Sequence, residues 1–94
     1  MHIRRCLWSE YVVDKIAWKH HLSTEEVEKA LSSRPRIRRI ERGRLKGEDV
    51  YVAYGRTDAG RYLTVFFIYK QSEYALILSA RTMDEKERAA YRRK

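Results

Sequence analysis

The chain has 94 residues, and its 21 lysines and arginines outnumber 13 aspartates and glutamates, which gives a formal charge of +8. This length supports one domain with a modest core, expected to span 1–94. The apolar fraction of 44% excludes a disordered chain, and the longest apolar run, 63–69, is too short to cross a membrane. The charge excess predicts a polyanionic or acidic partner, with a merely soluble basic surface as the alternative.

The cysteine content bounds the redox chemistry. Cys6 is the only cysteine, so an intrachain disulfide is excluded and a cytoplasmic, reducing location is expected. Arg4 and Arg5 beside it could lower the pKa of this thiol, but no Cys-His-Asp pattern supports a nucleophile. No CxxC or HExxH spacing occurs and the N-terminus lacks a signal-peptide apolar region, so we expect no metal site, no cofactor and no leader.

The first predicted helix runs from about residue 10 to 21, with Ser9 as its N-cap. One face carries apolar residues at helical spacing: Val12, Val13, Ile16 and Ala17. His20 lies in the middle of this face. A second apolar stripe, made of Tyr11, Trp18 and Leu22, lies on another side of the helix. It is either core or a surface for a partner or a second copy.

The second predicted helix begins with a capping box. Ser23 is its N-cap and Glu26 reaches back to the backbone of Ser23. Its inward residues are Val27, Ala30 and Leu31, and the helix ends before Pro35.

The middle of the chain is predicted to be β-structure. The strands are expected at 36–42, 50–56, 61–69 and 74–80, joined by turns rich in glycine and polar residues. The third of them is apolar on both alternating sets, which is typical of a central strand covered on both faces.

A basic helix is predicted over 82–94, with Thr82-Met83-Asp84-Glu85 as its capping box. Its core-facing residues are expected to be Met83, Glu87, Ala90 and Tyr91. Glu87 then needs a partner, either Arg81, Arg88 or a histidine, in a structural ion pair or a catalytic role. The predicted fold class is α+β, with two N-terminal helices, a three- to four-stranded antiparallel sheet and a C-terminal helix.

Arginines crowd the segment before and within the first of these strands, and tyrosines interleave with the charge further on. Arginine forks bind phosphates bidentately and exposed rings stack on unpaired bases. The candidate RNA-binding residues are Arg38, Arg39 and Arg61. The alternative is that most of these arginines are solvated and most of the rings belong to the core.

Lys19-His20-His21 is the candidate for proton transfer. Cleavage of RNA by its own 2′-hydroxyl needs a base, an acid for the leaving oxygen, and cations for the phosphate charge. His20 or Lys19 could supply the base or the acid, and Arg56, Arg61 and Arg81 could supply the cations. His20 as a hydrogen-bonded core histidine is the alternative. Adjacent histidines on a helix point apart, so they make a poor metal pair.

These motifs, in their order and spacing, resemble the BrnT toxins of type II toxin–antitoxin systems, which have a RelE-like fold. The resemblance spans about 8–91 and depends on Lys19-His20, Tyr54-Gly55-Arg56-Thr57, Gly60-Arg61, Ile77-Leu78-Ser79-Ala80-Arg81 and Glu87-Arg88. It implies RNA cleavage without a metal, and neutralisation by a cognate antitoxin of the ribbon-helix-helix type. It carries the catalytic positions onto Lys19, His20, Arg56 and Arg81.

Two other functions stay open from the residues themselves. One is a non-catalytic module that binds RNA or DNA, which would need arginines and exposed rings but not His20. The other is a protein-interaction domain whose basic face binds an acidic protein. The lysine, histidine and arginines at element ends favour a toxin ribonuclease, and the oligomeric state stays undetermined.

Overall fold

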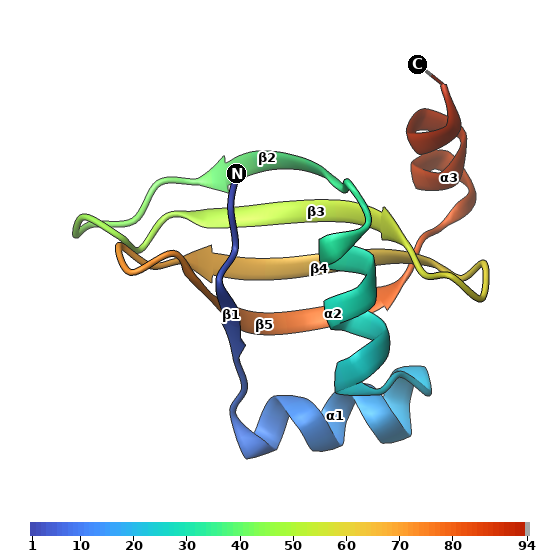
Figure 1. The fold of residues 1–94 in the computed structure, drawn as a ribbon, viewed down its shortest axis with the longest axis horizontal. Coiled ribbons are helices and arrows are strands. Elements are labelled where there is room, and N and C mark those ends of the chain that lie inside the picture. The colour runs from blue at the N-terminus through green and yellow to red at the C-terminus, as the bar shows by residue number, and fades with distance from the viewer. Residues whose placement is uncertain (94) are drawn as a thin grey trace.

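A computed structural model describes residues 1–93 of the chain as a five-stranded sheet and three helices (Figure 1). The strands are β1 (Arg5–Leu7), β2 (Arg36–Glu41), β3 (Val50–Arg56), β4 (Tyr62–Tyr69) and β5 (Tyr74–Thr82). The helices are α1 (Glu10–His20), α2 (Thr24–Ser32) and α3 (Glu85–Arg92). The strand order is β1-β5-β4-β3-β2, in which β2 to β5 form an antiparallel meander. The predicted α+β class is confirmed.

The predicted strand count was too low because it omitted β1. This strand has only three residues and pairs in parallel with Tyr74–Leu76 of β5. A segment this short shows no measurable alternation of apolar and polar residues, so the sequence pattern does not reveal it. Its place at the edge depends on β5, which lies far away in the sequence.

A β-bulge in β5 decides which way Arg81 points. Ile77 pairs with Phe67 and Ser79 pairs with Phe66, so Leu78 is an extra residue between them. Regular alternation would put Ile77 and Arg81 on the same face, because they are four residues apart. The bulge reverses the alternation, so Ala80 enters the core and Arg81 turns to the opposite face.

The helices α1 and α2 cover one face of the sheet (Figure 1). The core between them is formed by fully buried apolar side chains from both layers, including Ile16, Val27, Leu63, Val65, Phe67 and Ile77. The inward residues predicted for α2 are all buried, as expected. None of the three helices in residues 1–93 has the length and apolar content that crossing a lipid bilayer requires.

The predicted caps of α1 and α2 are confirmed. The Ser9 hydroxyl accepts from the Val12 N–H, and Ser23 and Glu26 form the reciprocal capping box. The helix α1 ends in an αL motif, in which His21 has a left-handed backbone (φ 55°) and its N–H donates to the Ala17 carbonyl, while the Leu22 N–H donates to the Ile16 carbonyl.

This C-terminal motif divides the second apolar stripe of α1. Leu22 is buried against the core, whereas Tyr11 and Trp18 are each 73% exposed. The stripe is therefore not one continuous surface. Two large aromatic side chains lie on the outside of the helix.

The N-cap of α3 is Asp84 rather than Thr82, because β5 continues through Thr82. Thr82 pairs with Leu63, and the Met83 N–H donates to the Tyr62 carbonyl, so the helix cannot begin earlier. The capping box is formed by Asp84 and Glu87. Of the residues predicted to face the core from α3, only Met83 is buried, and it lies before the helix begins. No residue of α3 itself is buried, so this prediction was wrong in part.

The backbones of β3 and α2 come very close together at Gly55. A Cβ atom at Gly55 would lie 2.4 Å from the Ala30 carbonyl oxygen and 3.0 Å from its carbon. The nearest obstacle is backbone, which cannot rotate away as a side chain can. The sequence therefore needs glycine here for space, and not for an unusual backbone angle.

We predict that Gly55→Ala lowers the free energy of unfolding by about 1–3 kcal/mol, because α2 must move off the sheet. Urea unfolding followed by circular dichroism measures this loss. The control is Ala30→Gly in the Gly55→Ala background, which leaves the obstructing carbonyl in place and should restore nothing. An unchanged urea midpoint for Gly55→Ala would contradict the close approach.

Candidate active site

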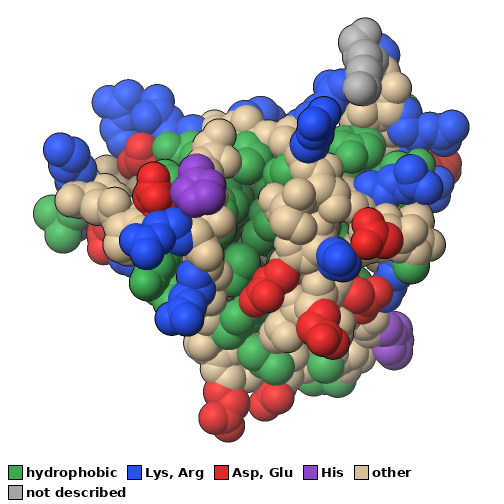
Figure 2. Space-filling view, in the orientation of Figure 1, with side chains coloured by type: hydrophobic (Ala, Val, Ile, Leu, Met, Phe, Trp, Pro, Cys, Tyr) green, Lys and Arg blue, Asp and Glu red, His purple; other side chains and the backbone are tan. Residues whose placement is uncertain are grey.

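The carboxyl ends of α1, β3 and β5 meet at one end of the sheet, where β4 begins and α3 passes (Figure 1). This end carries His20, Arg56 and Arg81, which come from three separate parts of the sequence. Most acidic side chains on the face seen in Figure 2 gather over α1 and α2, while lysines and arginines lie around the ends of the sheet. The site end is thus basic.

Arg81 is held in one orientation. Its Nη1 and Nη2 atoms donate to the two carboxylate oxygens of Glu87 at 2.7 and 2.8 Å, and Nη1 also donates to the Thr82 carbonyl at 3.3 Å. Its guanidinium lies 5.6 Å from the centre of the Phe66 ring. The Nε–H and the other Nη2–H lie side by side on one edge of the guanidinium and have no protein acceptor within residues 1–93. These two donors can therefore bind a phosphate.

Glu87 joins three elements through its carboxylate. Besides Arg81, it accepts from the buried Thr64 hydroxyl of β4 at 3.1 Å and from the Asp84 N–H at 2.9 Å. The hydrogen bonds from Arg81, more than those from the Asp84 backbone and Thr64, lower the pKa of Glu87 to about 2 despite its partial burial. Glu87 is therefore ionised near neutral pH.

His20 is the last residue of α1, the helix that packs against β5. β1 pairs only with the first residues of β5, so within residues 1–93 the edge near Ser79–Thr82 carries no strand and α1 packs along it instead. Partial burial first, and then the charges of Lys19, Lys15 and Arg81, lower the pKa of His20 below its ordinary 6.5. The imidazole is neutral near pH 7 and can accept a proton.

Lys19 and Arg56 frame this end of the sheet. Lys19 is exposed on α1 next to His20. Arg56 is exposed at the end of β3, on the same face as Arg81, and its guanidinium lies 5.6 Å from the centre of the Tyr62 ring. Arg88 of α3 lies over the same ring at 4.4 Å. Two cations therefore lie against Tyr62 beside the site.

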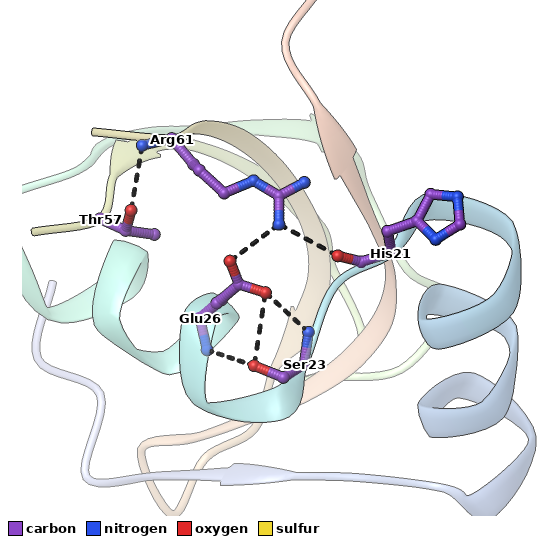
Figure 3. A network of polar contacts seen from close by, with 5 residues as sticks. All are labelled: His21, Ser23, Glu26, Thr57 and Arg61. Carbon is purple, nitrogen blue, oxygen red and sulfur yellow. Dashed lines mark hydrogen bonds and ion pairs between the residues drawn. The ribbon is translucent and has the colours of Figure 1, made fainter. Parts of the chain in front are cut away.

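Arg61 fixes the turn between α1 and α2 to the turn between β3 and β4 (Figure 3). Its Nη1 atom donates to Glu26 at 2.8 Å and to the His21 carbonyl at 3.0 Å, and its backbone N–H donates to Thr57. The N-cap contacts from Ser23, and then Arg61, lower the pKa of Glu26. Figure 3 shows the His21 ring pointing away from this network.

The neighbours Arg38 and Arg39 lie on opposite faces of β2. Arg38 pairs with Val52 and shares the face of Arg81, whereas Arg39 pairs with Tyr51 on the helix-covered face. Arg39 is bound to Asp49 at 3.3 Å, while Arg38 has no ion pair within the described part of the chain. The structure thus separates two arginines that the sequence reading treated together.

The thiol of Cys6 is not activated. Burial first, and then the nearby charge of Glu28, raise the pKa of Cys6 to about 11. The expected lowering by Arg4 and Arg5 is wrong, because both arginines are exposed and the thiol faces inward. Residues 1–93 contain no group of three or more His, Cys, Asp or Glu side chains placed to hold a metal ion.

The sequence analysis missed Thr64. Strand pairing aligns Tyr54, Thr64 and Arg81 in one row across three strands. A hydroxyl inside an otherwise apolar strand was the signal that could have revealed Thr64, because a buried polar group needs a partner.

The comparisons with known proteins agree with this architecture. The family described as "Ribonuclease toxin, BrnT, of type II toxin-antitoxin system" matches residues 8–87. The crystal structure of the ribonuclease toxin BrnT from Brucella abortus superposes with a TM-score of 0.61 at 19% identity, covering 86% of this chain and 97% of that one. No curated protein matches the chain.

The fold and the site together define a class of protein. It is a small, basic α+β protein in which a histidine, and an arginine held by a carboxylate, lie at one end of the sheet. The family match spans most of the chain, so the chain belongs to the BrnT ribonuclease toxins of type II toxin–antitoxin systems. RNA is therefore its substrate and an antitoxin its partner. The predicted family and toxin function are confirmed.

We predict that Glu87 stabilises the fold in a pH-dependent way. Its pKa is about 2 in the folded protein against an ordinary 4.5, so its contribution is present above pH 4.5 and is lost as the pH falls toward about 2. The difference in free energy of unfolding between wild type and Glu87→Gln should shrink over that window, as measured by urea unfolding at several pH values. In the Arg81→Ala background this pH dependence should weaken, and an equal dependence there would contradict the role of Arg81.

Proposed function

We propose that this toxin cleaves single-stranded RNA by attack of the RNA's own 2′-hydroxyl, without a metal ion, at the end of the sheet that carries His20 and Arg81. The supporting observation is their convergence. His20 is the half-buried histidine of the three, and it lies near an arginine that Glu87 and Phe66 hold in place. A neutral imidazole beside a fixed guanidinium fork suits this reaction.

The reaction divides between these groups as follows. His20 takes the proton of the 2′-hydroxyl, and the oxygen attacks the adjacent phosphorus. Arg81 holds two of the phosphate oxygens through its Nε and Nη2 donors while their charge increases. The bond from phosphorus to the 5′-oxygen then breaks, and a general acid protonates that oxygen. The products are a 2′,3′-cyclic phosphate and a 5′-hydroxyl.

Lys19 and Arg56 are proposed for the remaining roles. Lys19 precedes His20 on α1 and is exposed, and in this proposal it protonates the leaving oxygen. The reverse assignment of base and acid between Lys19 and His20 is the alternative. Arg56 adds positive charge on the face of Arg81, where the chain on one side of the cleaved phosphate would lie. Arg61 is committed to Glu26, so in this proposal it affects RNA chiefly by positioning the end of α1.

We predict that His20→Ala and Arg81→Ala each lower the rate of RNA cleavage by about 10²–10⁴-fold, because each removes a group that acts on the reacting atoms. The measurement uses labelled single-stranded RNA in the presence of a chelator, with the cyclic phosphate end scored. The matched control is His21→Gly, which removes the neighbouring imidazole while suiting the left-handed backbone. Its activity should stay near wild type.

The pH dependence assigns the proton-transfer role. If His20 is the base, cleavage rises with pH through its lowered pKa and then stays level; if it is the acid, cleavage falls instead. Unchanged cleavage in both folded alanine variants would contradict the site, and so would cleavage that the chelator abolishes. Binding of RNA without any cleavage would favour a non-catalytic module, unless added ribosomes restore cutting.

The antitoxin is proposed to be of the ribbon-helix-helix type, as the family resemblance implies, and to dock on the outside of α1. Tyr11 and Trp18 lie two turns apart there and are each 73% exposed. Large exposed aromatics are typical centres of protein interfaces, and an acidic partner would be attracted by the charge of +8.

We predict that Trp18→Glu weakens antitoxin binding by about 100-fold or more without unfolding the toxin, because a charge replaces an interface aromatic. Isothermal titration against the purified antitoxin measures the affinity, and circular dichroism checks the fold. Glu25→Gln on α2, another exposed position outside this patch, is the control and should bind normally. Loss of folding, or normal binding by Trp18→Glu, would contradict the surface.

A further inference from the structure

A groove separates α3 from the strands β2 and β3. It encloses a volume of about 380 Å³, within the range of small-molecule clefts, and it is open to solvent. Polar and aromatic side chains from both walls line it: Arg36, Arg38, Tyr54, Lys86, Glu87 and Tyr91. The groove lies on the sheet face that α1 and α2 leave uncovered, the same face to which Arg81 points.

The groove is electrostatically suited to an anion. Arg36, Arg38 and Lys86 bring three positive charges to its walls, against the single carboxylate of Glu87. That carboxylate is turned toward Arg81, Thr64 and the backbone of Asp84, so its charge is already neutralised. Arg36 keeps a fixed position because its Nη2 atom donates to the Arg93 carbonyl at 2.7 Å.

The groove also offers aromatic surface. Tyr54 lines the sheet wall and Tyr91 lines the helix wall. The ring of Tyr91 is held from two sides, by the edge of Tyr62 at 5.9 Å and by the guanidinium of Arg36 at 6.0 Å. Aromatic rings beside cations are the surfaces on which unpaired bases stack.

The groove connects directly to the cleavage site. Tyr54, Thr64 and Arg81 form one row across β3, β4 and β5, and Glu87 belongs to both the groove wall and the clamp on Arg81. Two strand spacings, about 10 Å in all, separate the sheet positions of Tyr54 and Arg81. A strand of RNA whose phosphate lies on Arg81 therefore reaches the groove within its next one or two nucleotides.

We propose that this groove is a nucleotide-binding subsite, which takes one unpaired nucleotide of the substrate RNA next to the cleaved phosphate. The base lies against Tyr54 or Tyr91, and Arg38 and Lys86 hold the phosphate. This inference rests on the proposed function, since it takes the cleaved phosphate to lie on Arg81. It also gives the toxin its requirement for a single strand, because a base inside a duplex cannot enter the groove.

The neighbouring pair Arg38 and Arg39 provides the test. Each loses one positive charge on substitution by alanine, but only Arg38 lines the groove, while Arg39 lies on the other face with Asp49. The probe is a fluorescent single-stranded oligonucleotide with 2′-fluoro riboses, which cannot be cleaved by 2′-hydroxyl attack. Its binding is measured by anisotropy over a series of salt concentrations, with circular dichroism as the check on folding.

We expect Arg38→Ala to weaken binding about 5-fold or more and to reduce the magnitude of the salt slope by about 0.7, the value of one phosphate contact on a single strand. Tyr54→Ala and Tyr91→Ala should weaken binding about 5-fold or more with little change in salt slope, because stacking releases no counterions. Arg39→Ala should bind as wild type does. A self-complementary duplex of the same length should bind equally to wild type and Arg38→Ala.

Two outcomes would overturn the subsite. Equal losses in Arg38→Ala and Arg39→Ala would mean that only overall charge attracts RNA. Normal RNA binding by Arg38→Ala, with loss of antitoxin binding instead, would make the groove a protein-docking surface. Neither outcome depends on catalysis, since the probe is uncleavable. The failure of the subsite is thus distinguishable from failure of the proposed chemistry, which the His20 and Arg81 variants report.

Discussion

The carboxylate of Glu87 is the constraint on which the geometry of the candidate active site depends. Its contacts with Arg81, Thr64 and the Asp84 backbone join β5, β4 and α3 at one point. Because α3 buries no residue of its own, this polar junction supplies much of what fixes the helix. The same carboxylate takes one edge of the Arg81 guanidinium and leaves the other edge open, so the contact that secures α3 also aims the arginine.

The sheet divides structural and functional work between its faces. The face covered by α1 and α2 holds the apolar core, and α1 and α2 carry five of the acidic residues: Glu10, Asp14, Glu25, Glu26 and Glu28. The opposite face holds Arg38 of β2, Tyr54 and Arg56 of β3, and Arg81 of β5. Acidic residues near the helices cannot repel a polyanion bound on the far face as strongly as they would on the same face. The positive charge of the protein is therefore least offset on the face where we propose that RNA binds.

Much of the fold could be predicted because local signals and tertiary contacts agree. The caps at Ser9 and Ser23 and the apolar spacing of α2 are decided within one or two helical turns, and the structure keeps them. The start of α3 was misplaced because two capping-box spacings overlap there, one beginning at Thr82 and the other at Asp84. The choice between them depends on the pairing of Thr82 with Leu63, a contact with a strand distant in sequence.

The sequence predicted which types of residue make up the candidate site, but it predicted less well how their side chains are arranged in space. Arg81 faces the open side only because of the bulge at Leu78, which no local pattern announces. Strict alternation would have placed it in the core with Ile77. From charge alone, the sequence offered Arg81, Arg88 or a histidine as the partner of Glu87. The structure shows that Glu87 pairs with Arg81. The separation of Arg38 from Arg39, by contrast, follows from the two-residue period of any strand.

At the C-terminal end of α1, contacts that stabilise the fold also set the position of a proposed catalytic residue. The helix α1 ends at His20, and the left-handed residue His21 stops it there. A non-glycine residue in that conformation costs about 1 kcal/mol, so other contacts must hold it. Leu22 is buried behind it, and Arg61 binds the His21 carbonyl together with Glu26 (Figure 3). In the proposed mechanism Arg61 therefore acts on RNA cleavage by fixing where the helix ends, while Arg81 acts on the phosphate itself.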